Sequence, residues 1–297
     1  MKKIIYKCSM FAAVVLLATS CQKMDEPGLG DFPKDTNPPG GALKFYAAFD
    51  GTTDNGLKNA VDSIRANYPS ENPFQSVDGI NGKAIQGEAG KFIKYASFND
   101  WAQSSSFTIS YWVKKDGQTL NNTGGNGPEY AFSIRGTKKD NNDYHWSSSV
   151  MLVFLEGNNA AAALKVMVVN PSDPSNVESS PEDHWFEWAG GEALSGVLNN
   201  QWHHIALTYD EVSSNMKLYV DGVQNPNVKN WAGHGKMRLS THRAAEYRVG
   251  GGPRNPDEAD GAGGWLQSSL KGNIDQLRLY NTVLTAAEVN TLFTTKQ

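Results

Sequence analysis

Residues 201–222, with the sequence Q-W-H-H-I-A-L-T-Y-D-E-V-S-S-N-M-K-L-Y-V-D-G, restrict the fold of this chain more than any other stretch. Residues 202–209 are mostly β-branched, aromatic or otherwise apolar, residues 210–215 have the composition of a turn, and residues 216–220 alternate between apolar and polar. The pattern predicts a β-hairpin. An isolated hairpin is only marginally stable in water, so we expect it to belong to a sheet whose other strands come from distant parts of the chain.

Short segments of the same kind recur through the chain, and Gly, Asn, Asp and Ser separate them. Two stretches are predicted to be helical, residues 57–67 and residues 285–293, and the second begins with the capping-box pair Thr285 and Glu288. The predicted strands are 43–49, 92–95, 107–113, 130–134, 150–155, 164–169, 202–209, 216–220, 247–249 and 274–280.

Alternation within a predicted strand indicates which of its faces is buried. In residues 107–113, the side chains of Phe107, Ile109, Tyr111 and Val113 point to one face, which we predict to be the core. Many short strands over one core are typical of an all-β, two-sheet antiparallel jelly-roll sandwich. We therefore predict this fold, with a short C-terminal helix, as a single domain that covers residues 42–297.

The N-terminus has the pattern of a lipoprotein signal peptide. Three lysines precede an apolar run that is too short to span a bilayer, and L-A-T-S-C places small residues directly before Cys21. We predict that residues 1–20 are removed and that Cys21 carries the lipid. The alternative is an ordinary signal peptide with an incidental cysteine. Residues 21–41, which are rich in Pro and Gly, are predicted to be a flexible tether.

Charge and cysteine content argue against several classes of function. The precursor has a formal net charge of −4, and because residues 1–20 contain three lysines and no acid, the chain without them has −7. No basic surface for nucleic acid and no polybasic membrane patch is predicted, so the lipid is expected to be the only membrane contact. Cys8 would leave with the signal peptide and Cys21 would be lipidated, which leaves no cysteine for a disulfide.

The hairpin at 201–222 and the stretch 272–292, G-N-I-D-Q-L-R-L-Y-N-T-V-L-T-A-A-E-V-N-T-L, resemble the core hairpin and the last strand with its closing helix in laminin G-like jelly rolls, which belong to the concanavalin A-like lectin and glucanase superfamily. The resemblance covers roughly residues 43–293. It implies the fold more specifically than the function, because this fold carries lectins, glycosidases, lyases and adhesion modules. The residues Q-K-M-D-E after Cys21 resemble the export signal of Bacteroidota surface lipoproteins, which implies a lipid-anchored protein exposed on the outer membrane.

The sequence lacks the catalytic motif that the retaining glucanases of this superfamily carry. That motif is E-x-D-x-x-E, in which alternation places three carboxylates on one face of a strand. The acids within residues 182–187 have the wrong spacing, and those within residues 258–260 have no third partner. An enzyme is therefore not indicated, although acids that are distant in sequence could still meet in the fold.

Residues 171–191 are predicted to form a long loop in which Trp185, Phe186 and Trp188 lie among acidic side chains. Flat aromatic rings stack on the apolar faces of sugars, while carboxylates and amides take the hydroxyl groups. These three residues are the predicted carbohydrate-binding site. The alternative is that their rings fold back as a small core under the loop. Both interpretations apply also to Trp146, Trp231 and Trp265.

A structural calcium ion is predicted at two acids that are distant in sequence. Asp275 lies on the apolar face of the predicted strand 274–280, where an unpaired charge is costly. The resemblance implies that Asp275 and, by a looser match, Asp50 bind calcium, since the first and last strands of such a sandwich are usually neighbours. The alternative is that a nearby base or backbone amide donates to Asp275. His203 and His204 are adjacent on a strand, point to opposite faces and cannot share a metal ion.

Taken with the resemblance, these features predict a non-catalytic, glycan-binding surface lipoprotein that assists polysaccharide capture, in a complex with a SusC-like transporter. Two alternatives remain open from the sequence. One is a glycoside hydrolase or lyase with a non-standard acid pair. The other is an adhesion module in which aromatic side chains contact a protein partner.

Overall fold

The computed structural model describes residues 40–50, 57–61, 66–67, 74–118, 127–136, 149–157, 160–173, 175–176, 179, 181–240, 243–258 and 264–296. These residues all belong to one compact unit, residues 38–297. The predicted signal peptide, the predicted lipidation site Cys21 and the predicted tether up to residue 39 lie outside the described residues. No helix in the described part of the chain is long and apolar enough to cross a membrane.

The chain forms two antiparallel sheets, which confirms the predicted all-β sandwich. The first, sheet A, contains the hairpin that the sequence predicts and places it in the same sheet as the first and last strands of the domain. In spatial order sheet A is β14 (Val223–Gln224), β13 (Asn215–Val220), β12 (Asn199–Asp210), β6 (Phe107–Asp116), β17 (Asn273–Tyr280), β4 (Lys83–Gln86) and β3 (Gln75–Asp78), with β1 (Leu43–Ala47) on β17 and β15 (Lys229–Asn230) on β13.

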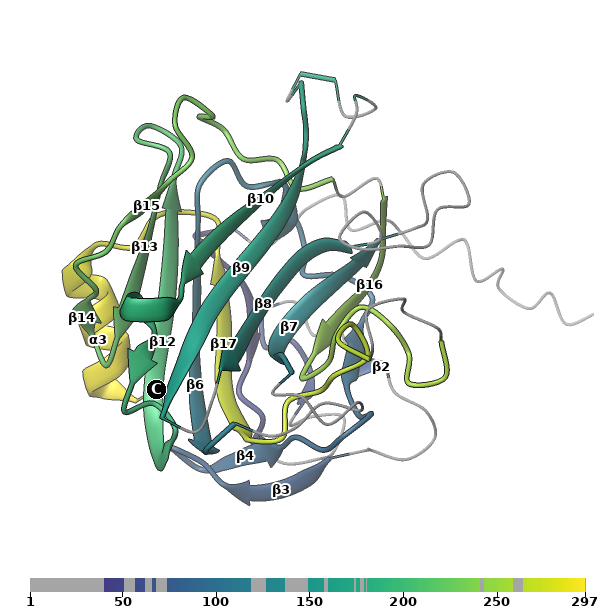
Figure 1. Ribbon diagram of the computed structural model, residues 1–297, viewed down its shortest axis with the longest axis vertical. Coiled ribbons are helices and arrows are strands. Elements are labelled where there is room, and N and C mark those ends of the chain that lie inside the picture. Colours follow the sequence, from purple (N-terminus) through teal and green to yellow (C-terminus); the bar gives the residue numbers. More distant parts are fainter. Residues whose placement is uncertain are drawn as a thin grey trace, which may run out of the picture. The chain divides into compact units, whose positions relative to one another are not determined.

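Sheet B faces sheet A, and Figure 1 looks onto it, with β10, β9, β8 and β7 drawn in front of β6 and β17. Two short 3-10 turns, η1 (Trp101–Gln103) and η3 (Gly190–Glu192), lie in the connections between strands. In spatial order sheet B is β10 (Pro181–Trp188), β9 (Ala161–Pro171), β8 (Ser149–Gly157), β7 (Glu129–Gly136), β16 (Ala244–Val249), β5 (Ile93–Tyr95) and β2 (Ala66–Asn67), with β11 (Leu194–Ser195) on β9.

The main core fills the space between the two sheets, and the alternation of β6 sets its contribution from sheet A. The predicted inward set, Phe107, Ile109, Tyr111 and Val113, is buried there. Lys115 continues the same face by two more residues and is also buried, because Glu129 of β7 meets its ammonium group from sheet B. Strand β6 therefore runs further than the predicted strand 107–113.

The C-terminal helix α3 (Ala286–Thr295) begins at Thr285 with the predicted capping box. Its Val289 packs with Ala206 and Tyr219 against the face of sheet A that points away from sheet B. In Figure 1 the helix lies along β13 and β14. The outer face of sheet A is thus partly covered by the chain's own C-terminal helix.

Two predictions of secondary structure are wrong. The predicted helix at 57–67 ends in a strand, since Ala66–Asn67 form β2 and pair with β5. The predicted loop at 171–191 contains β10, an eight-residue strand that pairs with β9 over its whole length, from Pro181 opposite Pro171 to Trp188 opposite Leu164. The acids of this segment hid its period of two, because they share an edge strand with the aromatic residues and give it the composition of a loop.

Candidate functional site

The outer face of sheet B, meaning the face turned away from sheet A, carries a second apolar cluster. Alternation places these side chains opposite to the main core. Half-buried Trp185 of β10 and Trp265, from the loop after β16, pack on this cluster at the surface. Its buried members are Tyr130, Leu152, Phe154, Met167 and Val169.

The structure corrects the predicted carbohydrate site at two of its three residues. Phe186 and Trp188 are 1% and 0% exposed and belong to the main core. The indole of Trp188 donates to the carbonyl of Asn227 at 2.7 Å. Residues 185 and 188 of one strand point to opposite faces, so their rings cannot form a single platform. Of the predicted group, Trp185 alone lies on the outer face of sheet B.

Trp265, for which the sequence left both interpretations open, lies on the same outer cluster as Trp185. Its ring meets Phe154 edge-on, with centroids 4.9 Å apart, and Tyr130 edge-on at 5.8 Å. Trp185 meets the same Phe154 edge-on at 6.3 Å. In the strand order β10-β9-β8-β7, Trp185 lies on the β10 side of Phe154. Tyr130, which Trp265 contacts, lies on the β7 side of Phe154. We call Trp185 and Trp265, with Phe154 and Tyr130 beneath them, the aromatic platform.

An ion chain lies beside the platform. Lys165 of β9 contacts Glu156 of β8 at 3.0 Å and Glu187 of β10 at 3.1 Å, and the indole of Trp265 donates to Glu156 at 2.8 Å. Burial works against the charge on Lys165, but its hydrogen bonds to both glutamates outweigh burial and raise the pKa of the ammonium above its ordinary value. The chain therefore offers charged hydrogen-bond donors and acceptors next to two indole rings.

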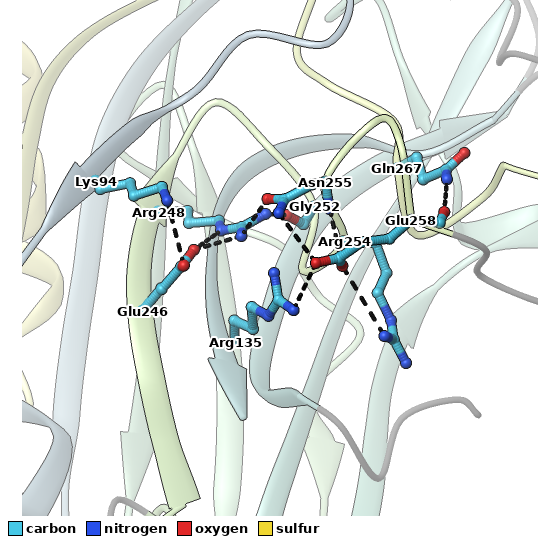
Figure 2. A network of polar contacts seen from close by, with 9 residues as sticks. All are labelled: Lys94, Arg135, Glu246, Arg248, Gly252, Arg254, Asn255, Glu258 and Gln267. Carbon is cyan, nitrogen blue, oxygen red and sulfur yellow. Dashed lines mark hydrogen bonds and ion pairs between the residues drawn. The ribbon is translucent and has the colours of Figure 1, made fainter. Parts of the chain in front are cut away.

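A larger polar network continues across β7, β16 and β5 (Figure 2). Arg248 is its centre: its guanidinium donates to Glu246, to the carbonyl of Gly252 and to Asn255, and lies 4.2 Å from the ring centroid of Phe92. Figure 2 shows Lys94 reaching the same Glu246 from β5. The remaining members are Arg135, Arg254, Glu258 and Gln267.

The acids of this network are held as carboxylates. Burial alone would raise the pKa of Glu246 and of Glu258, but Arg248 and Lys94 at the first, and Arg135 at the second, lower both values overall. A general acid for glycoside cleavage needs a raised pKa. Glu246 and Glu258 are therefore suited to accept hydrogen bonds and poorly suited to donate a proton.

The two acids of the predicted calcium site meet at one turn. Asp275 of β17 is 0% exposed, and its Oδ2 accepts from the backbone N–H of Ile80 at 2.8 Å, while the Oδ1 of Asp50 accepts from that of Lys83 at 2.9 Å. An added Cβ at Gly79 would lie 2.4 Å from Oδ2 of Asp275, so this turn approaches the carboxylate too closely for any larger residue. Strand β1 pairs with β17, as expected for the first and last strands.

As far as the structure describes them, the surroundings of these two acids lack positive charge, as a cation site would, but they supply few side-chain ligands. Within the described residues Oδ1 of Asp275 is buried and has no hydrogen-bond partner. Burial, together with the charge of Asp50, raises the pKa of Asp275 to about 7. Both observations indicate that the Asp275 carboxylate lacks a positively charged partner among these residues. However, the described residues contain no group of three or more His, Cys, Asp or Glu side chains placed to hold a metal ion, so backbone oxygens and water would have to complete a calcium shell.

The histidines behave as the strand geometry requires. His204 is buried, with its Nε2 2.8 Å from Oγ of Ser110, and His203 faces the other way, with Nδ1 2.8 Å from Oδ2 of Asp221. The two rings therefore have separate partners. Trp146, which the sequence left open between two interpretations, lies outside the described residues.

Comparison with known proteins identifies the type of domain. The sequence model of a family described as Concanavalin A-like lectin/glucanases superfamily matches residues 87–290. No curated protein sequence matches the chain.

Similar solved structures share the fold at low sequence identity. Domain 4 of AbnA, a GH43 extracellular arabinanase from Geobacillus stearothermophilus solved with arabinotriose, has a TM-score of 0.49 and 19% identity over 84% of this chain and 98% of that one. The binding domain of Paraclostridial Mosquitocidal Protein 1 has a TM-score of 0.52 and 17% identity, and the botulinum neurotoxin type G receptor binding domain 0.51 and 15%. Each alignment covers 86% of this chain and 52% of the toxin chain, so the chain spans about half the length of these two.

Proposed function

Because the chain belongs to the Concanavalin A-like lectin/glucanases superfamily, we propose that the outer face of its sheet B binds a glycan without cleaving it. The observation that carries this proposal is the pair of half-buried indoles, Trp185 and Trp265, beside the ion chain of Glu156, Lys165 and Glu187. Indole faces stack on the apolar faces of sugar rings, and charged groups at the edge take the hydroxyls. The platform and the ion chain together supply both kinds of contact.

Binding is favoured over cleavage by the state of the acids on this face. Glu246 and Glu258 have lowered pKa values, and Lys165 is shared between Glu156 and Glu187. A cleaving enzyme would need one acid that keeps its proton near neutral pH. The carboxylates on this face are instead held in position by basic side chains, where they can accept hydrogen bonds from a ligand.

An array of immobilised polysaccharides, followed by an assay for new reducing ends, separates the three functions that the sequence left open. Retention of the protein on a polysaccharide without release of reducing ends is the expected result. Release of reducing ends or of unsaturated products would instead show a glycoside hydrolase or lyase. Absence of both binding and product would favour an adhesion module with a protein partner.

Replacing Trp185 or Trp265 with Ala is expected to lower affinity for the retained glycan at least about tenfold, because a buried aromatic contact carries a large share of binding energy in small interfaces. Isothermal titration calorimetry measures the effect. Trp202→Ala is the matched control, since Trp202 is a half-buried tryptophan on β12 of sheet A. Equal losses in the control and in the platform variants, or unchanged affinity in all three, would rule out the platform.

We propose further that the protein is lipid-anchored at Cys21 on the outer face of the outer membrane, where it would present glycan to a SusC-like transporter complex. The lipobox-like L-A-T-S-C and the following Q-K-M-D-E support this placement. The thioether to a diacylglycerol needs the Cys21 sulfur, so Cys21→Ala is expected to move the protein from the detergent phase to the aqueous phase in phase partitioning. Cys8→Ala, inside the predicted signal peptide, should leave the partitioning unchanged. Retention of the Cys21→Ala protein in the detergent phase would contradict the anchor.

A structural calcium ion is the last part of the proposal, with Asp275 and Asp50 as its side-chain ligands. A bound calcium ion would supply the positive charge that an ionised Asp275 lacks in its buried position. Because the residues around it join β17, the start of the domain and the turn at 79–82, we expect the effect of this ion to be on stability.

A further inference from the structure

Three aromatic rings lie in one parallel stack at the edge of the sandwich. The ring of His184 lies 4.2 Å from that of Trp231 with an interplanar angle of 4°, and the ring of His234 lies 3.5 Å from that of Trp231 at 8°. Trp231 therefore lies between two imidazole rings that are parallel to it. None of these three residues belongs to the aromatic platform.

The stack joins the edge strand of sheet B to the segment that follows β15 of sheet A. His184 lies on β10, the edge strand of sheet B, which pairs with β9. Trp231 and His234 follow β15, which pairs with β13 of sheet A. His184 is also the direct chain neighbour of Trp185. A change in the stack therefore acts on the half of β10 that carries one ring of the aromatic platform.

Hydrogen bonds fix the protonation state of His234. Asn170, fully buried at the end of β9, places its Nδ2 at 3.1 Å from Nε2 of His234. The amide cannot turn round, because its Oδ1 accepts from the backbone N–H of Arg238 at 2.6 Å and its Nδ2 donates to the carbonyl of Pro171. Nε2 of His234 must then accept, so it carries no proton. Protonation of His234 would place two donors against each other.

The charged groups around the stack do not offset the cost of protonating its two histidines. Burial lowers the pKa of His184 and of His234 below the ordinary histidine value, with Glu182 opposing both shifts and Asp183 opposing that of His184. From β12, the Tyr209 hydroxyl donates to the carbonyl of Gly235 and is neutral, since burial raises its pKa to about 12. Stacking one cation on an indole is attractive, but two cations on the same indole repel each other.

We propose that the His184–Trp231–His234 stack is an acid-sensitive clasp that holds β10, and with it Trp185, in the binding position, and that protonation of both histidines releases this half of the strand. The stack is stable where both rings are neutral. A histidine whose pKa is lower in the folded state than in the unfolded chain stabilises the folded arrangement at pH values above its ordinary pKa. This contribution is lost as the pH falls below about 6.5. The consequence for ligand binding rests on the glycan-binding role proposed above.

The test compares the full chain with the double variant His184→Phe/His234→Gln between pH 7 and pH 5. Phe keeps a ring in the stack, and the Gln carbonyl can accept from Nδ2 of Asn170, so the variant keeps these contacts without the titration. Hydrogen exchange of the β10 amides and calorimetric affinity for the glycan retained on the array are both measured. In the wild type we expect affinity to fall about tenfold and β10 protection to decrease towards pH 5, because protonation of the two histidines favours the released strand.

The variant is expected to keep both its affinity and its β10 protection at pH 5. An identical pH response in the two proteins, or unchanged β10 protection in the wild type, would overturn the clasp. If no glycan binds at any pH, the glycan-binding role fails, and the exchange of the β10 amides still decides whether the clasp opens. Unchanged affinity at pH 5 together with lost β10 protection would show that the clasp opens without controlling the site, which would overturn its regulatory part.

Discussion

Replacing Lys115 with Met is expected to lower the free energy of unfolding by about 3–5 kcal/mol, which is the cost of leaving one charge of a buried ion pair without its partner. Lys115 of β6 and Glu129 of β7 are each 2% exposed and form an ion pair from one sheet to the other. Burial lowers the pKa of Lys115, and the attraction of Glu129 opposes that shift. With Lys115 gone, Glu129 keeps the backbone N–H of Lys271 at 2.9 Å but loses the ammonium group that meets it from sheet A.

The double variant Lys115→Met/Glu129→Gln separates the ion pair from packing. It removes both charges, and the amide oxygen introduced by Glu129→Gln can still accept from the backbone of Lys271, so most of the lost stability should return. Urea unfolding of the wild type, both single variants and the double variant gives the coupling energy. A single-variant cost below about 1 kcal/mol, in the range of exposed ion pairs, would contradict this description of the pair.

Millimolar calcium is expected to raise the melting temperature of the wild type by several degrees over its value in EDTA, and to have no such effect on Asp275→Asn. Binding at about a hundredfold excess over the dissociation constant contributes about 2.7 kcal/mol. In a domain of this size each kcal/mol corresponds to roughly 2–4 °C. Asn has the shape of Asp and can keep the hydrogen bond from Ile80, so the variant tests charge and not volume.

The stability of the calcium-free protein is also expected to depend on pH through Asp275. Without calcium, the folded state holds the Asp275 proton up to about pH 7, its pKa there, whereas an unfolded chain releases it near pH 4. Stability in EDTA should therefore fall as the pH rises from about 4 to 7, and at pH 8 Asp275→Asn should be more stable than the wild type by about 2–4 kcal/mol. Calcium, which contributes about 2.7 kcal/mol to the wild type alone, should remove most of the advantage of Asp275→Asn at pH 8. If calcium shifts neither protein, the proposed ion is wrong, although the stabilisation of Asp275→Asn in EDTA would still hold.

The sequence predicted those parts of the fold in which alternation and turn composition agree. The β12–β13 hairpin, the inward set of β6 from Phe107 to Val113 and the capping box at Thr285 all follow from side chains within a few residues of each other. The predicted strand 107–113 is shorter than β6, because a lysine at position 115 has the character of a strand end. Only the fold brings Glu129 to it, from a strand of the opposite sheet.

The candidate site was harder to predict, because its parts lie far apart in the sequence. Trp265 reaches Glu156 across more than a hundred residues, and Lys165 joins Glu156 and Glu187 across three neighbouring strands. No spacing in the sequence indicates such contacts. The error at Phe186 and Trp188 has another cause: an edge strand with several acids has the composition of a loop. The aromatic residues of that segment are evident in the sequence, but the acids between them obscure the period of two that divides them between two faces.

The most direct test of glycan binding at the outer face of sheet B is a titration of the protein with an oligosaccharide of the retained polysaccharide, followed through the indole N–H signals of its eight tryptophans by NMR. The proposal predicts that the signals of Trp185 and Trp265 move together and saturate, while those of Trp112, Trp188 and Trp202 stay in place. Shifts confined to other tryptophans, or no shift at any tryptophan with oligosaccharide in the millimolar range, would contradict it.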